Sequence, residues 1–288
     1  MALHFRDEDF GIRDEFPLGI VRHLDHRDKE LHTHDFAELV IVFHGSTVHF
    51  TTEQESPLKP GDVFFVPKGA QHGYRHSNNL TLVNVMYDPD RLRLPDSDLR
   101  SLPGYHAFFL LGHKFQKDMK PLHLPQPKLD EIARIIESIE DEIRHSSPGY
   151  MAMALAQLSQ LIVSLSRTYS SELTPPQEGS ELRIADAMAY VETHLDQEVS
   201  IPKLMKLTNL SESSLLRAFK KTVQMGPLEF HLHQRIRRSC RLLRKSDLSV
   251  TEIGFRVGFN DSNYFSRQFK KRMNMTPTEY RKILSRGP

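Results

Sequence analysis

The chain has 288 residues, of which 38 are Lys or Arg and 37 are Asp or Glu, so its formal net charge is only +1. This balance conceals an asymmetry: the segment Ser200–Pro288 carries 19 Lys or Arg against 6 Asp or Glu, and the remainder of the chain is acidic. A chain of this length is expected to hold two domains, and a basic segment beside an acidic one is typical of a nucleic-acid-binding domain attached to another module.

The composition also indicates the cellular compartment in which the protein is expected to act. The only cysteine, Cys240, cannot form an intramolecular disulfide, which suits a reducing environment. The N-terminal residues contain no apolar segment of the kind found in secretory signals, and no apolar run approaches the roughly 20 residues that a membrane span needs. We therefore expect a cytoplasmic protein with no membrane partner.

The N-terminal part is predicted to be a β-structure. Three short runs rich in β-branched and aromatic residues, Leu39–Phe43, Val63–Val66 and Leu80–Met86, are separated by turn signals containing Gly, Pro and Asn. Many short strands at this spacing favour an antiparallel barrel or jelly roll. We assign residues 1–126 to this β-barrel domain.

Four ionisable side chains in this domain form a candidate ligand site: His32, His34, Glu38 and His72. Their spacing, together with Gly45, Gly61, Pro67 and Gly69, resembles the two motifs of the cupin family, except that His76 stands where the second motif usually has Asn. In cupins the corresponding three His and one Glu converge inside the barrel on a divalent metal ion.

Three roles for this cluster stay open at this point. It can hold Fe, Mn, Ni or Zn and belong to an enzyme, it can hydrogen-bond the hydroxyl groups of a small effector without turnover, or it can be structural. We expect the second role, with no cofactor and no catalytic residue, and keep a divalent metal bound by the same four residues as the alternative. Phe43, Phe65 or Tyr74 could then stack on an apolar face of the effector.

Two amphipathic helices are predicted between residues 127 and 169, separated by a break at residues 146–149. Each carries an apolar stripe, which can either cover the barrel or form a homodimer interface. We name the segment a helical dimerisation segment. The stripes consist of Leu129, Ile132, Ile135, Ile136, Ile139 and Ile143 in the first helix and Leu155, Leu158, Leu161, Ile162 and Leu165 in the second.

Residues 170–181 are polar, contain two prolines and lack hydrophobic periodicity, so they are predicted to be a linker. The part that follows it, residues 182–288, is predicted to be entirely helical. The whole chain is thus expected to be a multidomain α+β protein, with an N-terminal barrel and a C-terminal all-α domain.

The C-terminal part contains an internal duplication with an offset of 50 positions. Arg217-Ala-Phe219-Lys220-Lys221 recurs as Arg267-Gln-Phe269-Lys270-Lys271, and a Pro-x-Glu-aromatic sequence follows each copy. Two equivalent helices that carry Arg and Lys can hold a polymer with a regular charged surface, and duplex DNA is such a polymer.

Each copy is predicted to be a helix-turn-helix. In the first, Ser200 and Ser211 are candidate N-caps, and in the second, Ser249 with Glu252 forms a capping box and Asp261 caps the next helix. Leu215 and Phe219 are expected to face inward in the first copy, as Phe265 and Phe269 are in the second, and a linking helix over residues 229–244 should join the two units.

The opposite faces of the two second helices are the candidate DNA-binding surface. A helix fits the major groove, where Arg pairs with guanine and Asn with adenine, and Lys neutralises phosphates at the flank. Two such helices in one chain can reach two successive segments of the groove. The residues predicted to contact DNA are Ser213, Leu216, Arg217, Lys220 and Lys221 in the first unit and Asp261, Ser262, Asn263, Ser266, Arg267, Lys270 and Lys271 in the second.

Residues 182–288 resemble the DNA-binding domain of the AraC/XylS family of transcription regulators. The resemblance rests on residues 249–253, 258–262, 265–271 and 276–281, and it implies that Arg217, Asp261, Asn263 and Arg267 meet base edges. Three positions depart from the family pattern. Asn209 replaces the usual Gly in the first turn, Met205 replaces a small residue, and Asn274 replaces a Gly; Asn tolerates positive φ, so the first turn can survive.

Several segments most resemble activators of L-rhamnose operons, among them His34-Asp-Phe-x-Glu38 and residues 79–87. We therefore predict a transcription regulator, expected to be an activator of a sugar catabolic operon that responds to a monosaccharide. Its partners would be promoter half-sites, a second copy of the chain and RNA polymerase. The alternative function is a metal-dependent cupin enzyme, a dioxygenase or isomerase, with an accessory basic domain.

Overall fold

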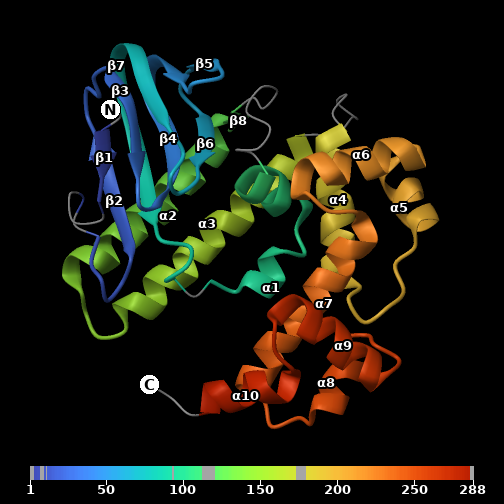
Figure 1. Ribbon diagram of the computed structural model, residues 1–288. Coiled ribbons are helices and arrows are strands. Elements are labelled where there is room, and N and C mark those ends of the chain that lie inside the picture. The colour runs from blue at the N-terminus through green and yellow to red at the C-terminus, as the bar shows by residue number, and fades with distance from the viewer. Residues whose placement is uncertain are drawn as a thin grey trace. The chain divides into compact units, whose positions relative to one another are not determined.

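The computed structural model describes residues 3–6, 10, 12–92, 94–111, 121–172 and 180–285. The chain forms two compact units, Met1–Gln177 and Glu178–Pro288. The first combines a β-sheet with helices, and the described part of the second is helical throughout (Figure 1). None of the described helices is long and apolar enough to cross a lipid bilayer.

The first unit is built around two long antiparallel strands, β4 and β7, which pair with each other along most of their length. The predicted runs at residues 39–43 and 80–86 are therefore parts of strands that are longer than expected. Different halves of β7 pair with β2 and β3, and different parts of β4 pair with β5 and β6. The described strands are β1 (Leu3–Phe5), β2 (Leu18–His23), β3 (Lys29–His34), β4 (Ala37–Phe50), β5 (Glu55–Leu58), β6 (Asp62–Val66), β7 (His72–Tyr87) and β8 (Leu122–His123).

The expected closed barrel is wrong, because the described strands form an open eight-stranded sheet. Its path runs β1-β3-β7-β4-β6-β8, with β2 attached to β7 and β5 attached to β4. Closure would require the two ends of the path to pair, but β1 has three residues and β8 has two. The sheet instead bends at register shifts within β4, where Gly45 has a φ of +76° and a Cβ atom would overlap the backbone oxygens of Asn78 and Asn79.

The helices of the first unit are α1 (Asp96–Leu99), the π-helix η2 (Tyr105–Leu111), α2 (Gln126–His145) and α3 (Tyr150–Glu172). Helix α2 packs against α3 and β2, and α3 also packs against η2. Ile132, Ile136 and Ile139 of the α2 stripe are completely inaccessible in a single chain, and the α3 stripe is mostly buried as well. The buried members of both stripes thus pack within the chain, which favours the covering role, whereas Ile143 and Leu155 are half-buried and the dimer interface stays a prediction.

The boundary between the units differs in detail from the predicted linker. Helix α3 continues to Glu172, past the predicted linker start at residue 170, and α4 begins at Ser180. Residues 173–179, the middle of the predicted linker, lie outside the described part of the chain.

The second unit contains seven described helices, and the two predicted helix-turn-helix units are α5–α6 and α8–α9. The linking helix α7 is longer than predicted by two residues at its N-terminal end and one at its C-terminal end. The helices are α4 (Ser180–Thr193), α5 (Ile201–Thr208), α6 (Glu212–Val223), α7 (Pro227–Lys245), α8 (Val250–Arg256), α9 (Ser262–Met273) and α10 (Pro277–Ser285).

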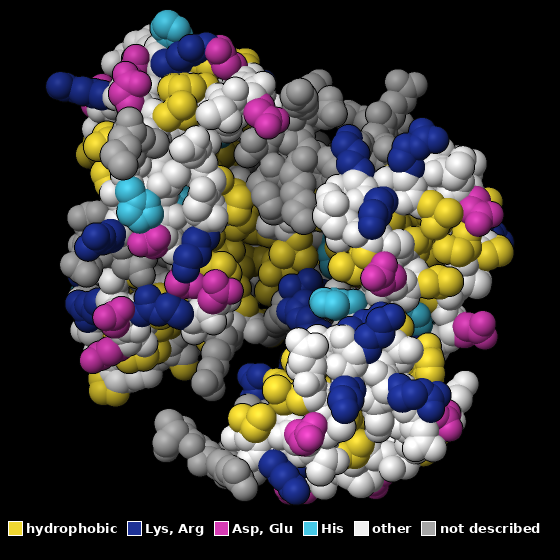
Figure 2. All heavy atoms as spheres, viewed as in Figure 1, with side chains coloured by type: hydrophobic (Ala, Val, Ile, Leu, Met, Phe, Trp, Pro, Cys, Tyr) yellow, Lys and Arg dark blue, Asp and Glu magenta, His cyan; other side chains and the backbone are white. Residues whose placement is uncertain are grey.

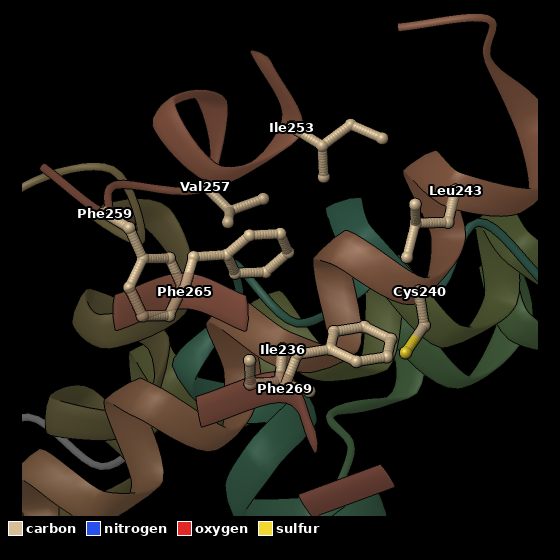
Figure 3. Packing of buried hydrophobic residues seen from close by; sticks show 8 residues of the cluster. All are labelled: Ile236, Cys240, Leu243, Ile253, Val257, Phe259, Phe265 and Phe269. Carbon is tan, nitrogen blue, oxygen red and sulfur yellow. The ribbon is translucent and has the colours of Figure 1, made fainter. Parts of the chain in front are cut away.

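The core of the second helix-turn-helix unit is formed by aromatic and aliphatic side chains from α7, α8 and α9. Phe265 and Phe269 are fully buried, as predicted, and their rings are 5.8 Å apart in an edge-to-face arrangement. Figure 3 shows these two rings with Ile236 and Cys240 of α7, Ile253 of α8 and Val257, the residue that follows α8. The equivalent residues of the first unit, Leu215 and Phe219, are also fully buried.

Caps and turns define the ends of these helices. The side chain of Ser211 accepts a hydrogen bond from the N–H of Ser214, and Ser249 and Glu252 form the predicted capping box. Ser200 occupies the N-cap position of α5, but its side chain makes no capping hydrogen bond. Asn209 has a φ of +50°, which confirms that the first turn survives the replacement of Gly by Asn.

Candidate nucleic-acid interface and effector pocket

The outer faces of α6 and α9 present chemically similar side chains at matching positions. On α6, residues 213, 216, 217 and 220 recur at the spacing of one helical face, and residues 263, 266, 267 and 270 do the same on α9. Each of these faces lies opposite the buried aromatic residues of its own helix. All twelve residues predicted to contact DNA are at the surface, Ser262 and Ser266 half-buried and the others exposed.

Some of these residues already have partners within the chain. Asp261 caps α9 by accepting a hydrogen bond from the N–H of Tyr264, so one of its carboxylate oxygens is engaged. The guanidinium of Arg267 lies over the ring of Tyr264, 5.9 Å from its centroid. Lys220 donates to the carbonyl oxygen of Gln224 at the end of α6. The arrangement leaves Asn263 and Arg267 as the best-placed hydrogen-bonding groups of α9 for base edges.

Basic side chains are spread across the second unit. Figure 2 shows Lys and Arg side chains over much of its visible face, with Asp and Glu side chains more sparsely placed. Such a surface attracts a polyanion at long range and weakens that attraction when salt is added.

One side chain that the sequence did not single out joins the two helix-turn-helix units. Arg235 of α7 donates from Nε to the carbonyl oxygen of Leu195 at 2.6 Å and from Nη2 to that of Gln197 at 2.8 Å, both in the connection between α4 and α5. Its guanidinium also lies 5.6 Å from the ring centroid of Phe259, in the turn between α8 and α9. We call this set of contacts the Arg235 joint. It connects the first helix-turn-helix to the second, within the C-terminal unit.

Gly258 belongs to the same region. Its φ is +93°, and a Cβ atom there would lie 2.6 Å from both Leu195 O and Arg235 Nη2. The turn of the second helix-turn-helix thus lies close to the connection that precedes the first helix-turn-helix, at a position that only Gly fits. The sequence carried no signal for this contact, because the partners are about 60 residues apart and follow no motif.

The four residues predicted to form the effector site come together in the first unit. His32 and His34 lie on β3, Glu38 lies near the start of β4 and His72 lies at the start of β7, where it is the register partner of His32. All four are buried, and none is more than 5% exposed. The β3–β7 pairing and the short turn between β3 and β4 explain why residues 40 positions apart meet.

Hydrogen bonds fix some of these side chains in orientation. Nδ1 of His34 donates to Phe36 O at 2.5 Å, Nδ1 of His32 donates to Glu30 O at 2.9 Å, and Asn84 Nδ2 donates to Glu38 Oε1 at 2.6 Å. Other buried atoms of the cluster have no hydrogen-bond partner: His34 Nε2, Glu38 Oε2 and both ring nitrogens of His72. Unpaired buried polar atoms are costly, so the cluster is chemically suited to a bound ligand.

Burial dominates the electrostatics of the cluster. Desolvation lowers the pKa of His32 and of His34 to about 4 and places that of His72 well below its ordinary value. Desolvation raises the pKa of Glu38 to about 7, although Lys29 and the hydrogen bond from Asn84 oppose that rise. Near neutral pH the histidines are therefore uncharged and can each offer both a donor and an acceptor.

Further residues extend the cluster beyond the predicted four. His49 and Tyr74 are register partners on β4 and β7, and their rings lie 5.4 Å and 5.7 Å from that of His72. His49 Nε2 and the Tyr74 hydroxyl are buried without hydrogen-bond partners. The sequence analysis left His49 unassigned, since a single His in a strand gives no sign of which face it occupies.

Two of the residues predicted to stack on an effector have different surroundings. The ring of Tyr74 lies beside the cluster, but that of Phe65 packs against Tyr87 and Phe109 instead. Its neighbour Phe64 faces the cluster side and lies 4.5 Å from the ring of His49. Successive residues of a strand point to opposite faces, so Phe64 and not Phe65 lies on the side of His49.

Comparison with known proteins finds a family match for each of the two compact units. Residues 18–162 match the AraC-like ligand binding domain, and residues 204–283 match a helix-turn-helix domain. The chain is 31% identical over 276 residues to the HTH-type transcriptional activator RhaS of Enterobacter sp., covering 95% of each chain. It is 29% identical over 279 residues to the HTH-type transcriptional activator RhaR of Mannheimia succiniciproducens, covering 97% of this chain and 96% of that protein.

Among solved structures, an AraC-type transcriptional regulator from Chromobacterium violaceum is 25% identical to this chain. The match covers 39% of this chain and 100% of that one, with a TM-score of 0.36.

Proposed function

This chain belongs to the AraC family of DNA-binding transcription regulators, and on that premise we propose that it is an activator whose first unit senses a monosaccharide. The matched domains and relatives are those of regulators, so the alternative of a cupin enzyme is not retained. The DNA-binding role rests on one observation above all: α6 and α9 carry exposed Arg and Lys at matching positions, Arg217 with Lys220 and Arg267 with Lys270, opposite matching buried cores.

In this proposal the two helices occupy successive major-groove segments of one promoter site. Asn263 and Arg267 read base edges in one segment, and Arg217 reads the other. Leu216 is 39% exposed and cannot hydrogen-bond a base, so it is suited to thymine methyl groups. The lysines at residues 220, 221, 270 and 271 would neutralise phosphates.

Genome-wide footprinting of the bound protein would identify the operator and the genes beside it. Binding titrations on that operator then test individual residues. Arg267→Ala should cost about 1–3 kcal/mol at one base pair and relax the preference there, whereas Lys271→Ala should weaken binding to all sequences alike. Affinity should fall steeply with added salt. Salt-independent binding, or equal effects of both substitutions on every sequence, would contradict the proposal.

We propose that the effector binds at the buried cluster of His32, His34, Glu38 and His72. The relatives are named as the HTH-type transcriptional activators RhaR and RhaS, the sequence resembles activators of L-rhamnose operons, and a sugar offers hydroxyl groups that can pair with the unpartnered atoms of the cluster. Calorimetry against pentoses, hexoses and 6-deoxyhexoses tests the class of effector. Glu38→Gln and His72→Ala should abolish the response to the effector while leaving DNA affinity without effector unchanged. Binding of none of these sugars by the folded protein would refute the monosaccharide.

We further propose that the protein acts in the cytoplasm as a homodimer that contacts RNA polymerase. The α2 stripe is mostly buried, so we place the dimer interface at the start of α3, where Met151 and Met153 are 39% and 51% exposed. Replacing both with Glu should yield monomers in sedimentation experiments, with unfolding unchanged. A dimer that persists in this variant would place the interface elsewhere.

A further inference from the structure

Lys29 lies on the same face of the sheet as the buried cluster, although regular alternation along β3 would place it on the other face. Its register partner on β7 is Tyr74, and that of His32 is His72. Lys29 and His32 are three positions apart, whereas their partners are two positions apart, so β3 holds an extra residue between them. Because His72 and Tyr74 share a face of β7, this bulge brings Lys29 to that face as well.

Aromatic rings hold the Lys29 ammonium group beside the cluster. Its Nζ atom lies 4.2 Å from the ring centroid of Phe5 and 5.7 Å from that of Phe10. The ring of Phe5 in turn meets that of His32 edge to face, with centroids 5.3 Å apart. A cation–π contact stabilises an ammonium group but leaves its charge in place. The half-buried Lys29 therefore keeps a charge that a ligand can meet.

The Lys29 ammonium group acts on the cluster through its charge. Among the residues that the structure describes, none forms an ion pair with its nitrogen atom. Burial lowers the pKa of Lys29, and the charge of Glu38 opposes that effect. Burial is also the main reason for the lowered pKa of His34 and of His72, and the charge of Lys29 adds to it in both cases. The field of this cation thus reaches the centre of the cluster.

We propose that the pocket selects monosaccharides that carry a carboxylate group, and that Lys29 binds this carboxylate. This selectivity rests on the proposed sugar-sensing function, to which it adds the chemical class of the sugar. A neutral sugar would leave the half-buried ammonium charge without a counterion, whereas a sugar acid forms a charge-assisted hydrogen bond with it. The hydroxyl groups of the sugar remain available to the unpartnered atoms of the cluster, among them the Tyr74 hydroxyl across the ladder from Lys29.

One lysine suits a carboxylate better than a phosphate group. A phosphate monoester carries a charge of about −1.5 to −2 and three strong acceptor oxygens, which proteins meet with Arg side chains or several backbone N–H groups. The imidazoles of His32, His34 and His72 are neutral near pH 7, because burial lowers their pKa. The Glu38 carboxylate has a partner of its own in Asn84, which donates to Oε1 at 2.6 Å. The charge that Lys29 offers therefore matches a monoanion such as a hexuronate.

Calorimetry of the full chain with matched pairs of sugars tests this selectivity. The pairs are galacturonate with galactose, glucuronate with glucose, and mannuronate with mannose. In any pair that binds, the acid should bind about 10–100-fold more tightly than the neutral sugar, because only the acid can bond the ammonium group. Lys29→Met should remove this preference by weakening the acid and leaving the neutral sugar unchanged. Lys29→Arg should keep most of it, because the charge stays.

Lys59→Met is the matched control, because it removes the same charge from an exposed position between β5 and β6 of the same unit. It should keep the full preference for the acid. Urea denaturation shows whether each variant is folded. If Lys29→Met is not, the wild-type affinities still decide, because equal affinities for the two members of a pair overturn the proposal. A preference that survives in folded Lys29→Met overturns it as well.

Lactate and malate, which are hydroxy acids but not sugars, separate this selectivity from the proposed monosaccharide. If they bind in place of any sugar and lose affinity in Lys29→Met, the carboxylate site is supported and the monosaccharide is refuted. Neutral sugars that bind as tightly as their acids refute the carboxylate site and leave the proposed monosaccharide unaffected. Binding of sugar phosphates alone would overturn the carboxylate, and binding of none of these compounds would overturn both proposals.

Discussion

Arg235→Ala tests whether the two helix-turn-helix units act as one rigid reader of DNA. The substitution removes two charge-assisted hydrogen bonds, at 2.6 Å and 2.8 Å, and the contact with the ring of Phe259. Hydrogen bonds that involve a charged group contribute about 1.5–3 kcal/mol each when buried, and a cation–π contact at an exposed site about 0.5–1 kcal/mol.

The expected loss is smaller than the sum of these values. The guanidinium is half-buried, and Leu195 O keeps a second partner in His231 Nε2 at 3.3 Å. We therefore expect Arg235→Ala to lower the free energy of unfolding by about 2–4 kcal/mol, measured by urea denaturation. The free energy of unfolding of Arg235→Lys should lie between those of the wild type and Arg235→Ala, because an ammonium group cannot reach both carbonyls with the same geometry.

The functional consequence should appear only on DNA that engages both units. Affinity for a complete operator should fall, because both helix-turn-helix motifs must then be held in register. Affinity for a fragment carrying one half-site should not fall, because the joint itself does not contact DNA. Arg238→Ala is the matched control; it removes the same charge from α7 without breaking the two contacts with carbonyl oxygens. If Arg238→Ala is equally harmful, or if Arg235→Ala weakens both DNAs alike, the joint does not couple the units.

Three further predictions concern stability. Phe269→Ala should lower the free energy of unfolding by about 3–5 kcal/mol, because the side chain is fully buried. Phe255→Ala on neighbouring α8, where the side chain is 54% exposed, should lower it by well under 1 kcal/mol. Urea denaturation measures both, and equal losses would contradict the assigned core. Gly45→Ala should destabilise the first unit by about 2–4 kcal/mol, because φ is +76° and the backbone of Asn79 occupies the space; a neutral result in the same assay would mean that β4 can relax there. Burial, with a smaller effect of Arg235, lowers the pKa of His231 to about 4, so this residue is neutral in the fold and takes up a proton first in the unfolded chain. The contribution of His231 to the free energy of unfolding should then be constant above about pH 6.5 and fall by up to about 3 kcal/mol as pH approaches 4. His231→Gln should reduce the total fall by about that amount, and an unchanged pH profile in the variant would assign the fall to other groups.

What could be predicted from the sequence was local or repeated. The duplication located both helix-turn-helix units, and i, i+4 spacing identified Phe265 and Phe269 as buried. The cap at Ser249 and the left-handed turn at Asn209 also follow from short-range preferences. Such features depend on neighbours within a few residues, which the sequence displays directly.

What could not be predicted depends on contacts between distant segments. Whether strands close into a barrel depends on the pairing of the first and last strands, which no local pattern encodes. The ring neighbours of Phe64 and Phe65 could not be predicted either, because the face of a strand changes with every residue and the sequence does not show which face meets the cluster. His49 and Arg235 were missed for a related reason: each acquires its role only from partners in segments distant in the sequence.

The Arg235 joint has a consequence for bases that the protein does not touch. If α6 and α9 are held at one separation, the DNA between their two groove segments must bend or twist to meet both. The cost of that deformation depends on the intervening sequence, since pyrimidine–purine steps yield easily and A-tracts resist. Operators should therefore differ in strength according to the mechanical softness of their uncontacted centre, and promoters could be graded by those base pairs while every direct contact stays the same.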